Sequence, residues 1–419
     1  MVDPDSFTPA LPARQPPGSG DGLEVRIVRT GESLLESLGR AIDGMPDPPR
    51  GPQALARRLG IDKVLASRVL AALRSADPLF VVHRSPGPEP LRRTLDALAR
   101  EGVDGELVAG ARAAVDQFEQ LIRDEVGDRS ALDAIVAAWL PEARREFELR
   151  RKQAAHKAMS HLRGALARAI MATVILAPSE SDPDRLDVVW LNGLFGIARL
   201  RPRAGVKIVT RRFAPEVSQQ RRPLNLSGEP IEEMHQATLE EFSSRPTPSF
   251  DVVRAGDAIH YSLAGARYGP RSAVDLVMAE VNRAEMRRAV PSGSGRKGYV
   301  FAEISTPAES LQLDAILHRD VYPGSSPSIR VYDTSFEGVA DANNPARDID
   351  VLDMLESVET LGGGVGMLRS PDVPRYPDLL RHVYSRLGWR DSEFRAFRCR
   401  VEYPVYGSQV AMLFDPPTD

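Results

Sequence analysis

The residues best suited to chemistry lie in LHRDVYPGSSPSIRVYDTS, from Leu317 to Ser335. Histidine, aspartate, tyrosine and arginine side chains can hold a polar ligand or move a proton. Two strand-like runs flank the Pro-Gly-Ser turn, so a hairpin would bring their polar groups to one side of the domain. A solvated surface is the simpler alternative. The ligand-binding candidates are His318, Asp320, Tyr322, Arg330 and Tyr332.

Known catalytic and metal-binding patterns are incomplete in this chain. HRD at 318–320 resembles a kinase catalytic loop, but Ser325 stands where that loop needs Asn. GGGVG at 362–366 lacks the Lys of a phosphate loop. The seven His residues have no metal-ligand spacing, and Cys399 is predicted to pack as a small apolar residue. We therefore expect no catalytic residue, cofactor or metal.

Charge is unevenly distributed along the chain. The formal net charge is −4, which is not typical of a nucleic-acid-binding protein. Between Arg50 and Arg100, however, ten Lys or Arg residues stand against four acidic residues, a net charge of +6. A basic segment on an acidic protein favours local contact with phosphate groups. The alternative is an ordinary arginine-rich helical surface.

The basic segment contains the pattern of two short helices joined by a turn. In ALARRLGIDKVLASRVLAAL, from Ala54 to Leu73, Gly60 stands at the turn and Asp62 can cap the second helix. The helical period then directs apolar residues inward and a polar stripe outward. The expected inward residues are Val69, Leu70 and Leu73, and the expected outward residues are Lys63, Ser67 and Arg74.

This pattern resembles the winged helix-turn-helix of bacterial regulators of the IclR and MarR type, from Glu32 to Arg92. The resemblance implies a three-helix domain whose second paired helix enters the major groove of DNA. LFVVHR, residues 79–84, is expected as a strand of the wing. The DNA contacts so implied are Lys63, Val64, Leu65, Ser67, Arg68 and Arg84, and the outward stripe adds Arg74.

Two departures from the family pattern leave a second interpretation open. Val64 and Leu65 stand where such regulators commonly carry Ser or Thr, and apolar side chains cannot read hydrogen-bonding base edges. After LFVVHR, the turn SPGPEP leads into a helical pattern in place of a second wing strand. The alternative is a helix-turn-helix that serves as a packing or partner surface.

Composition divides the chain into four parts. Residues 1–24 are predicted to be a disordered tail, because they lack large apolar residues, and residues 25–100 form the helix-turn-helix domain. Residues 101–168 are predicted to be a helical linker, whose long helix from Pro141 pairs with its copy in a homodimer. Residues 169–419 are predicted to be a mixed body of helices and strands. The expected fold class is α+β, with a winged-helix-like N-terminal domain.

Apolar periodicity in the body predicts both strands and helices. Arg398, Arg400 and Glu402 alternate along one strand-like run and are expected to form a solvated stripe. Strands are expected within residues 186–213, 257–268, 298–305, 310–317, 328–334, 394–405 and 408–415. Helices are expected at residues 272–290, 349–361 and 376–389.

Together these features predict a DNA-binding transcriptional regulator whose body senses an effector or a partner. Its expected partners are double-stranded DNA, a second copy of the chain and a small-molecule effector. The longest apolar run, Ala169–Pro178, is too short to span a membrane, so we expect a cytoplasmic protein with no membrane partner. The alternatives are an assembly subunit that uses the helix-turn-helix for packing, and an enzyme with its site in the body.

Overall fold

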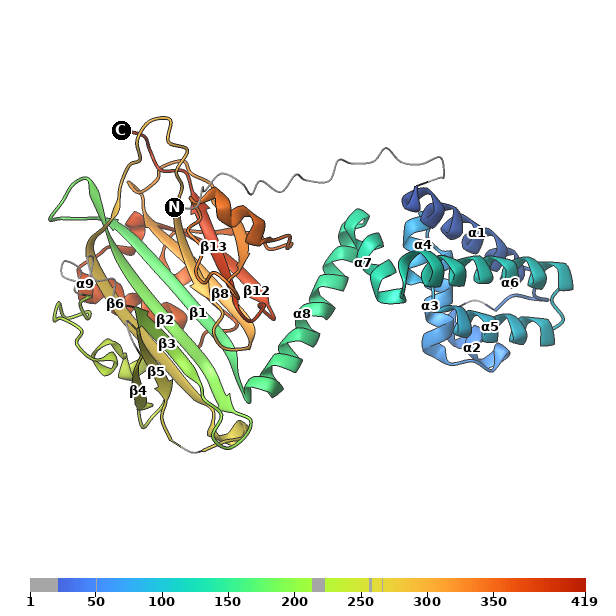
Figure 1. Cartoon of the computed structure of the whole chain (residues 1–419), viewed down its shortest axis with the longest axis horizontal. Coiled ribbons are helices and arrows are strands. Elements are labelled where there is room, and N and C mark those ends of the chain that lie inside the picture. The colour runs from blue at the N-terminus through green and yellow to red at the C-terminus, as the bar shows by residue number, and fades with distance from the viewer. Residues whose placement is uncertain (1–21, 50, 213–222, 256–257, 266) are drawn as a thin grey trace, which may run out of the picture. The chain divides into compact units, whose positions relative to one another are not determined.

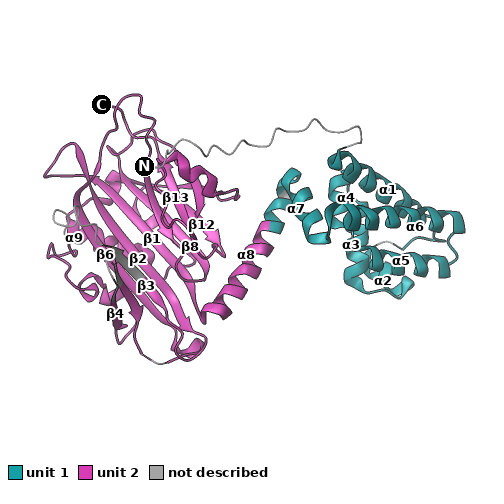
Figure 2. Cartoon of the chain, viewed as in Figure 1, with its two compact units in different colours: residues 1–147 teal, residues 148–419 magenta. Residues whose placement is uncertain are grey.

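A computed structural model describes residues 22–49, 51–212, 223–255, 258–265 and 267–419 (Figure 1). The chain forms two compact units, residues 1–147 (unit 1) and residues 148–419 (unit 2), coloured separately in Figure 2. The α+β fold class is confirmed: a helical N-terminal region precedes a sheet-rich body. Of the predicted tail, residues 1–21 lie outside the described residues, and a helix begins at Leu23.

Helices of unit 1 enclose one apolar core. Leu34, Leu95 and Phe118 are among its fully buried side chains, and they come from three different helices. The elements are α1 (Leu23–Asp43), α2 (Pro52–Leu59), α3 (Lys63–Leu73), α4 (Pro78–Arg84), α5 (Pro88–Arg100), α6 (Gly105–Gln120), the π-helix η1 (Leu121–Val126) and α7 (Arg129–Trp139).

The predicted wing strand is wrong. LFVVHR lies in α4, where Asp77 caps the helix by accepting a hydrogen bond from the Leu79 amide. Val81 and Val82 are fully buried in the unit 1 core. The cap and this burial stabilise a helix in a run whose β-branched residues suggested a strand. Residues 22–49 and 51–147 contain no strand, so a winged-helix arrangement is not shown.

The predicted long helix is present as α8 (Pro141–Arg163), and the boundary between the units falls within it. Among the apolar residues of this helix, Phe147, Leu149 and Met159 are half-buried within the chain itself. Leu162, in contrast, is 69% exposed. The homodimer stays a prediction, and the apolar surface that α8 offers it is smaller than its sequence suggests.

Unit 2 is built on three sheets. The largest has the strand order β11-β12-β8-β1-β2-β6 and is antiparallel except for the β1–β8 pair. A second sheet has the order β10-β9-β13-β7, and a third has the order β3-β5-β4. The strands are β1 (Ala165–Pro178), β2 (Arg185–Arg199), β3 (Lys207–Arg212), β4 (Phe250–Ala255), β5 (Ala258–Leu263), β6 (Val274–Arg287), β7 (Gly298–Glu303), β8 (Ala308–His318), β9 (Ser328–Asp333), β10 (Val351–Leu352), β11 (Glu359–Leu361), β12 (Phe394–Glu402) and β13 (Ser408–Phe414).

Alternate residues of the six-stranded sheet pack on its two faces. Val174 and Leu176 of β1 join the core shared with the four-stranded sheet, whereas Ile175 joins a core with helix α9 (Tyr376–Leu387). Cys399 is fully buried, as predicted. Short 3₁₀-helices lie in the connections: η2 (Met234–Ala237), η3 (Glu240–Phe242), η4 (Pro270–Ser272), η5 (Pro345–Asp350), η6 (Val365–Met367) and η7 (Asp391–Glu393).

Two of the three helices predicted in the body are wrong. Residues 272–290 contain strand β6, which pairs along its length with β2, and residues 349–361 contain the short strands β10 and β11. Apolar runs such as Leu276–Ala279 satisfy either period, and pairing with a neighbouring strand decides between them. The third predicted helix is confirmed as α9.

Candidate nucleic-acid interface

Helices α2 and α3 form the predicted helix-turn-helix. Gly60 follows α2 with a φ of 64°, a left-handed conformation that favours glycine. The carboxylate of Asp62 accepts hydrogen bonds from the amides of Val64 and Leu65 at 2.7 and 3.4 Å. Both local predictions are therefore confirmed, and they fix the direction in which α3 leaves the turn.

The two faces of α3 differ as the helical period requires. Ala66, Val69 and Ala72 are buried in the core of unit 1. Leu70 and Leu73, also predicted inward, are half-buried against the same core. Leu65 is half-buried too, and Val64 is 66% exposed. The remaining exposed residues of the predicted contact set on or beside α3 are Lys63, Ser67, Arg68 and Arg74.

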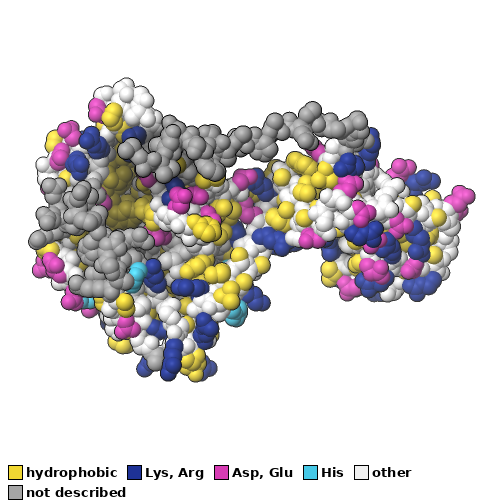
Figure 3. All heavy atoms as spheres, viewed as in Figure 1, with side chains coloured by type: hydrophobic (Ala, Val, Ile, Leu, Met, Phe, Trp, Pro, Cys, Tyr) yellow, Lys and Arg dark blue, Asp and Glu magenta, His cyan; other side chains and the backbone are white. Residues whose placement is uncertain are grey.

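Several cations on and near α3 lack an acidic partner. Over the face drawn in Figure 3, Lys and Arg side chains of unit 1 alternate with acidic ones, and Arg58 and Arg92 form ion pairs. By contrast, the side chains of Lys63, Arg74 and Arg93 form no hydrogen bond or ion pair with the described residues. Such cations retain mobile counterions, which phosphate groups can displace.

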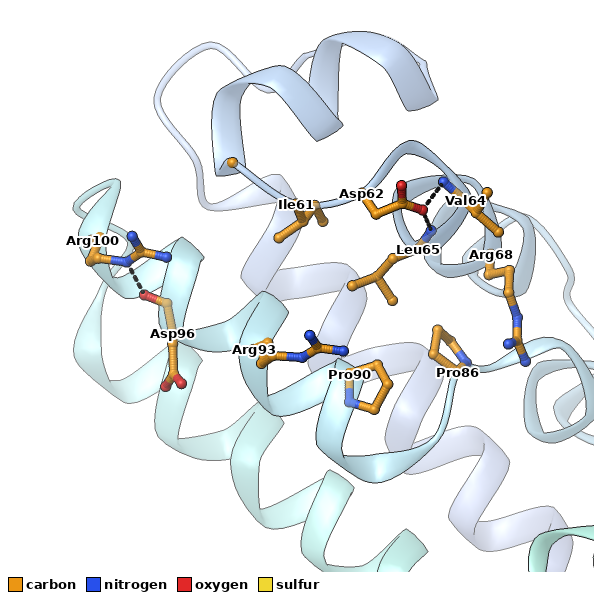
Figure 4. A pocket seen from close by; sticks show the side chains of 11 residues that line it. Ile61, Asp62, Val64, Leu65, Arg68, Pro86, Pro90, Arg93, Asp96 and Arg100 are labelled. Atoms are coloured by element: carbon orange, nitrogen blue, oxygen red, sulfur yellow. Dashed lines mark hydrogen bonds between the residues drawn. The ribbon is translucent and has the colours of Figure 1, made fainter.

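A hollow of about 500 Å³ lies beside the start of α3. Figure 4 shows Leu65 of α3 and Arg93 and Pro90 of α5 on its walls. The two carboxylates of the hollow have other partners than its arginines: Asp62 caps α3, and Asp96 pairs with Arg112. The full lining is Gly60, Ile61, Asp62, Val64, Leu65, Arg68, Pro86, Pro90, Arg93, Asp96 and Arg100.

Arg68 and Arg84 differ in how firmly they are held. Arg68 donates a hydrogen bond to the backbone oxygen of Ser85 at 3.2 Å. Arg84, expected on a wing, instead ends α4, where it lies 3.4 Å from a carboxylate oxygen of Glu146 and 5.2 Å from the centre of the Phe80 ring. Because its charge is already paired, Arg84 is a weaker phosphate contact than the sequence suggests.

His83 is a buried titratable group next to this surface. Its Nδ1 lies 3.9 Å from Asp133 and its Nε2 lies 3.9 Å from Glu146. Burial lowers the pKa of His83; Asp133 and Glu146 partly oppose this, whereas the cations Arg84 and Arg129 add to it. The imidazole is therefore held in its neutral form more strongly than in the unfolded chain.

This lowered pKa predicts an acid-sensitive unit 1. Below about pH 6.5 the unfolded chain binds a proton at His83 that the folded chain resists, so the free energy of unfolding falls as pH is lowered. We expect the difference in melting temperature between pH 7.5 and 5.5 to be smaller for His83→Gln than for the parent chain. The exposed His161 supplies the control His161→Gln, which should behave as the parent. An unchanged pH dependence in His83→Gln would contradict the prediction.

The predicted ligand-binding hairpin of the body does not form. His318 ends β8 in the six-stranded sheet, whereas Arg330 and Tyr332 lie on β9 in the four-stranded sheet. Tyr322 and Tyr332 are both 1% exposed, and burial raises the pKa of Tyr322 to about 12. The structure thus separates these groups and removes two of them from solvent.

The more accessible candidates of the body are engaged locally. His318 lies 3.5 Å from the carboxylate of Asp320, and Arg330 donates a hydrogen bond to Asp348 at 2.9 Å. These two contacts are separate, and only the Arg330–Asp348 contact is an ion pair of permanently charged groups. No group of three or more His, Cys, Asp or Glu residues suited to a metal ion occurs in the described part of the chain.

Sequence reasoning missed the contribution of α5 to the interface. Arg93 and Arg100 line the hollow, and Arg100 donates a hydrogen bond to the backbone oxygen of Asp96 at 3.3 Å. Their charges were counted in the basic segment, but their position beside α3 depends on how α5 packs. The sequence therefore indicated this contribution of α5 through the net charge of residues 50–100 alone.

No family model matches the chain, and no curated protein matches it. Within the described residues, no helix has the length and apolar character needed to cross a membrane.

Proposed function

We propose that this chain is a transcriptional regulator that binds double-stranded DNA through α3. One observation carries the proposal: the exposed face of α3 lies beside cations that form no ion pair with a carboxylate in the described part of the chain. Lys63 and Ser67 on this face are exposed, which suits contacts to phosphates and base edges. Because Val64 cannot read base edges, affinity should depend more on charge than on sequence.

Unit 2 is proposed to act as the sensor. An effector or partner that binds one state of the protein more tightly would shift the population toward that state and so change DNA affinity. The proposed homodimer would present two copies of α3 to consecutive half-sites, about 34 Å apart on DNA.

Salt dependence of binding tests the DNA contact directly. We expect the full chain to bind a fluorescein-labelled duplex at low salt, with a log–log salt slope of several units. The variant Lys63→Ala/Arg93→Ala should bind more weakly, and its slope should be smaller by about two units because two phosphate contacts are lost. Fluorescence anisotropy measures both quantities.

The matched control removes two exposed arginines elsewhere. Arg123→Ala/Arg386→Ala changes the net charge by the same amount, on η1 and on α9. Its salt slope should equal that of the parent chain. The DNA proposal fails if the parent chain does not bind at low salt, or if both double variants lose the same amount of slope.

A protein-interaction module is the second candidate function. It is favoured by Val64, whose 66% exposed side chain borders a hollow that also contains Leu65 and Pro90. In that case the parent chain would show no salt-dependent DNA binding. Light scattering would instead detect its association with a protein partner, and Val64→Ser would abolish that association. For the DNA-binding function, Val64→Ser should leave the salt slope unchanged.

A further inference from the structure

Unit 2 exposes apolar side chains on the segment between β9 and β11. Phe336 is 97% exposed and Ile349 is 89% exposed, and Val339 and Val351 are 44% and 36% exposed. Single exposed apolar residues are common, whereas exposed apolar residues that form one patch mark an interaction site. We refer to Phe336, Val339, Ile349 and Val351 as the Phe336 surface.

The loop that carries Phe336 is fixed at both ends to β13 and the turn before it. At one end the amide and hydroxyl of Thr334 both donate to the backbone oxygen of Gly407, at 2.9 and 2.7 Å. At the other end the fully buried amide of Gln409 accepts from the Ala340 nitrogen and donates to the Ala340 oxygen, at 2.7 and 3.0 Å. The loop therefore presents Phe336 from a hydrogen-bonded frame.

Arg347 connects the loop that carries Phe336 and Val339 to the segment that carries Ile349 and Val351. Its side chain is 7% exposed and donates to the backbone oxygens of Gly338 and Val339, at 3.0 and 3.3 Å. It also forms an ion pair with Asp350 at 2.5 Å. Arg347 thus holds η5, which contains Ile349, against the Phe336 loop. A surface ordered before binding loses less conformational entropy when a partner docks.

The charges around the surface select the kind of partner. Residues 334–356 contain six acidic residues and one basic residue, Arg347, and that one basic side chain is buried. Glu337 and Asp348 are 68% and 60% exposed, and each is partly neutralised by an arginine, Arg347 and Arg330 respectively. This acidic rim repels nucleic acids and anionic membranes and attracts lysine and arginine side chains.

We propose that the Phe336 surface docks a basic, apolar segment of a partner protein. Phe336 and Ile349 enter apolar positions of that segment, and the acidic rim pairs with its lysines or arginines. A few anchor side chains that become buried at the centre of an interface supply most of its binding energy. The inference is independent of the DNA contact proposed for α3, which lies in unit 1 and requires the opposite charge.

A designed peptide tests the docking chemistry. The probe is a fluorescein-labelled amphipathic peptide of lysine and leucine, titrated with the full chain and followed by anisotropy. We expect Phe336→Ser/Ile349→Ser to bind it roughly tenfold or more weakly than the parent chain, because two anchors are removed. A peptide of glutamate and leucine should bind the parent chain weakly, because the acidic rim repels it.

Met367→Ser supplies the matched control. Met367 is 68% exposed on η6, outside the Phe336 surface, so this variant should bind the lysine peptide as the parent does. The proposal is overturned if the double variant binds as tightly as the parent, or if the parent binds both peptides equally or neither. It is also overturned if the parent chain self-associates and only the double variant does not, because the occupant is then a second copy.

Discussion

We expect Asp314→Ala to lower the free energy of unfolding of unit 2 by roughly 3–5 kcal/mol. Asp314 lies on β8 and is fully buried. Its carboxylate accepts hydrogen bonds from Nε and Nη2 of Arg398 at 2.8 and 2.7 Å, and from the hydroxyl of Tyr376 at 2.6 Å. Without this carboxylate, the guanidinium of Arg398 stays buried with no opposite charge.

Tyr376 connects the buried Asp314–Arg398 pair of the six-stranded sheet to helix α9. Its hydroxyl also lies 2.8 Å from the hydroxyl of Thr173 on β1. The substitution at Asp314 therefore leaves three polar groups, from β12, α9 and β8, with fewer hydrogen-bond partners: Arg398, Tyr376 and Gln312. Unpaired buried polar groups add to the cost of the lost ion pair.

Urea unfolding of the full chain, followed by tryptophan fluorescence, measures this loss, since Trp190 and Trp389 lie in unit 2. Asp372→Ala is the control, because it breaks a more exposed ion pair with Arg400 and should cost less than about 1 kcal/mol. Asp314→Leu/Arg398→Met removes both buried charges and should recover much of the stability. Equal losses in the two single variants would refute the prediction.

The second large effect is expected in unit 1, where Gly31→Ala should lower the free energy of unfolding by roughly 3 kcal/mol. Gly31 lies in the middle of α1 and is buried. A Cβ atom at this position would lie 2.7 Å from the carbonyl carbon of Pro78, at the start of α4. Since backbone occupies that space, α1 and α4 would have to move apart.

Gly39→Ala on the same helix separates this packing effect from helix propensity. A Cβ atom at Gly39 would meet no atom within 4 Å. Alanine there should raise the free energy of unfolding by up to about 1 kcal/mol, because glycine is a poor helix former. Urea unfolding followed by circular dichroism measures both variants. A loss in Gly39→Ala, or no loss in Gly31→Ala, would contradict the close approach of α1 and α4.

Local rules were sufficient for the helix-turn-helix. Gly60 adopts the left-handed turn, and Asp62 caps α3, because both effects depend on residues within one helical turn. The long helix from Pro141 and the helix α9 were predictable for the same reason. The fold class followed from the change of composition at the predicted boundary between residues 168 and 169.

Some apolar runs of the sequence fit both the helical period and the strand period. For these runs the tertiary structure decided whether a helix or a strand forms. LFVVHR became α4 because Val81 and Val82 find burial among helices of unit 1. The apolar run of β6 became a strand because β2 lies beside it and pairs with its backbone. Both outcomes depend on segments distant in sequence, which local propensity does not describe.

For the candidate site, the sequence determined the charge and the helix that carries it. The sequence did not determine which of the Lys and Arg side chains form ion pairs with acidic residues. Arg92 is paired with Glu119 of α6, whereas the neighbouring Arg93 has no such partner among the described residues and lines the hollow. The packing of α5 against α6 selects between them, because it directs one side chain toward acidic residues and the other toward α3.

The sequence by itself determined that Arg398 and Arg400 share one face of a strand, since strand side chains alternate with a period of two. Their expected solvation is wrong for Arg398, which is 7% exposed beneath Tyr376, whereas Arg400 is partly exposed and pairs with Asp372. Alternation fixes the direction of a side chain. Whether that direction leads to water or to a buried carboxylate depends on which distant segment covers the face, and only the tertiary structure decided that.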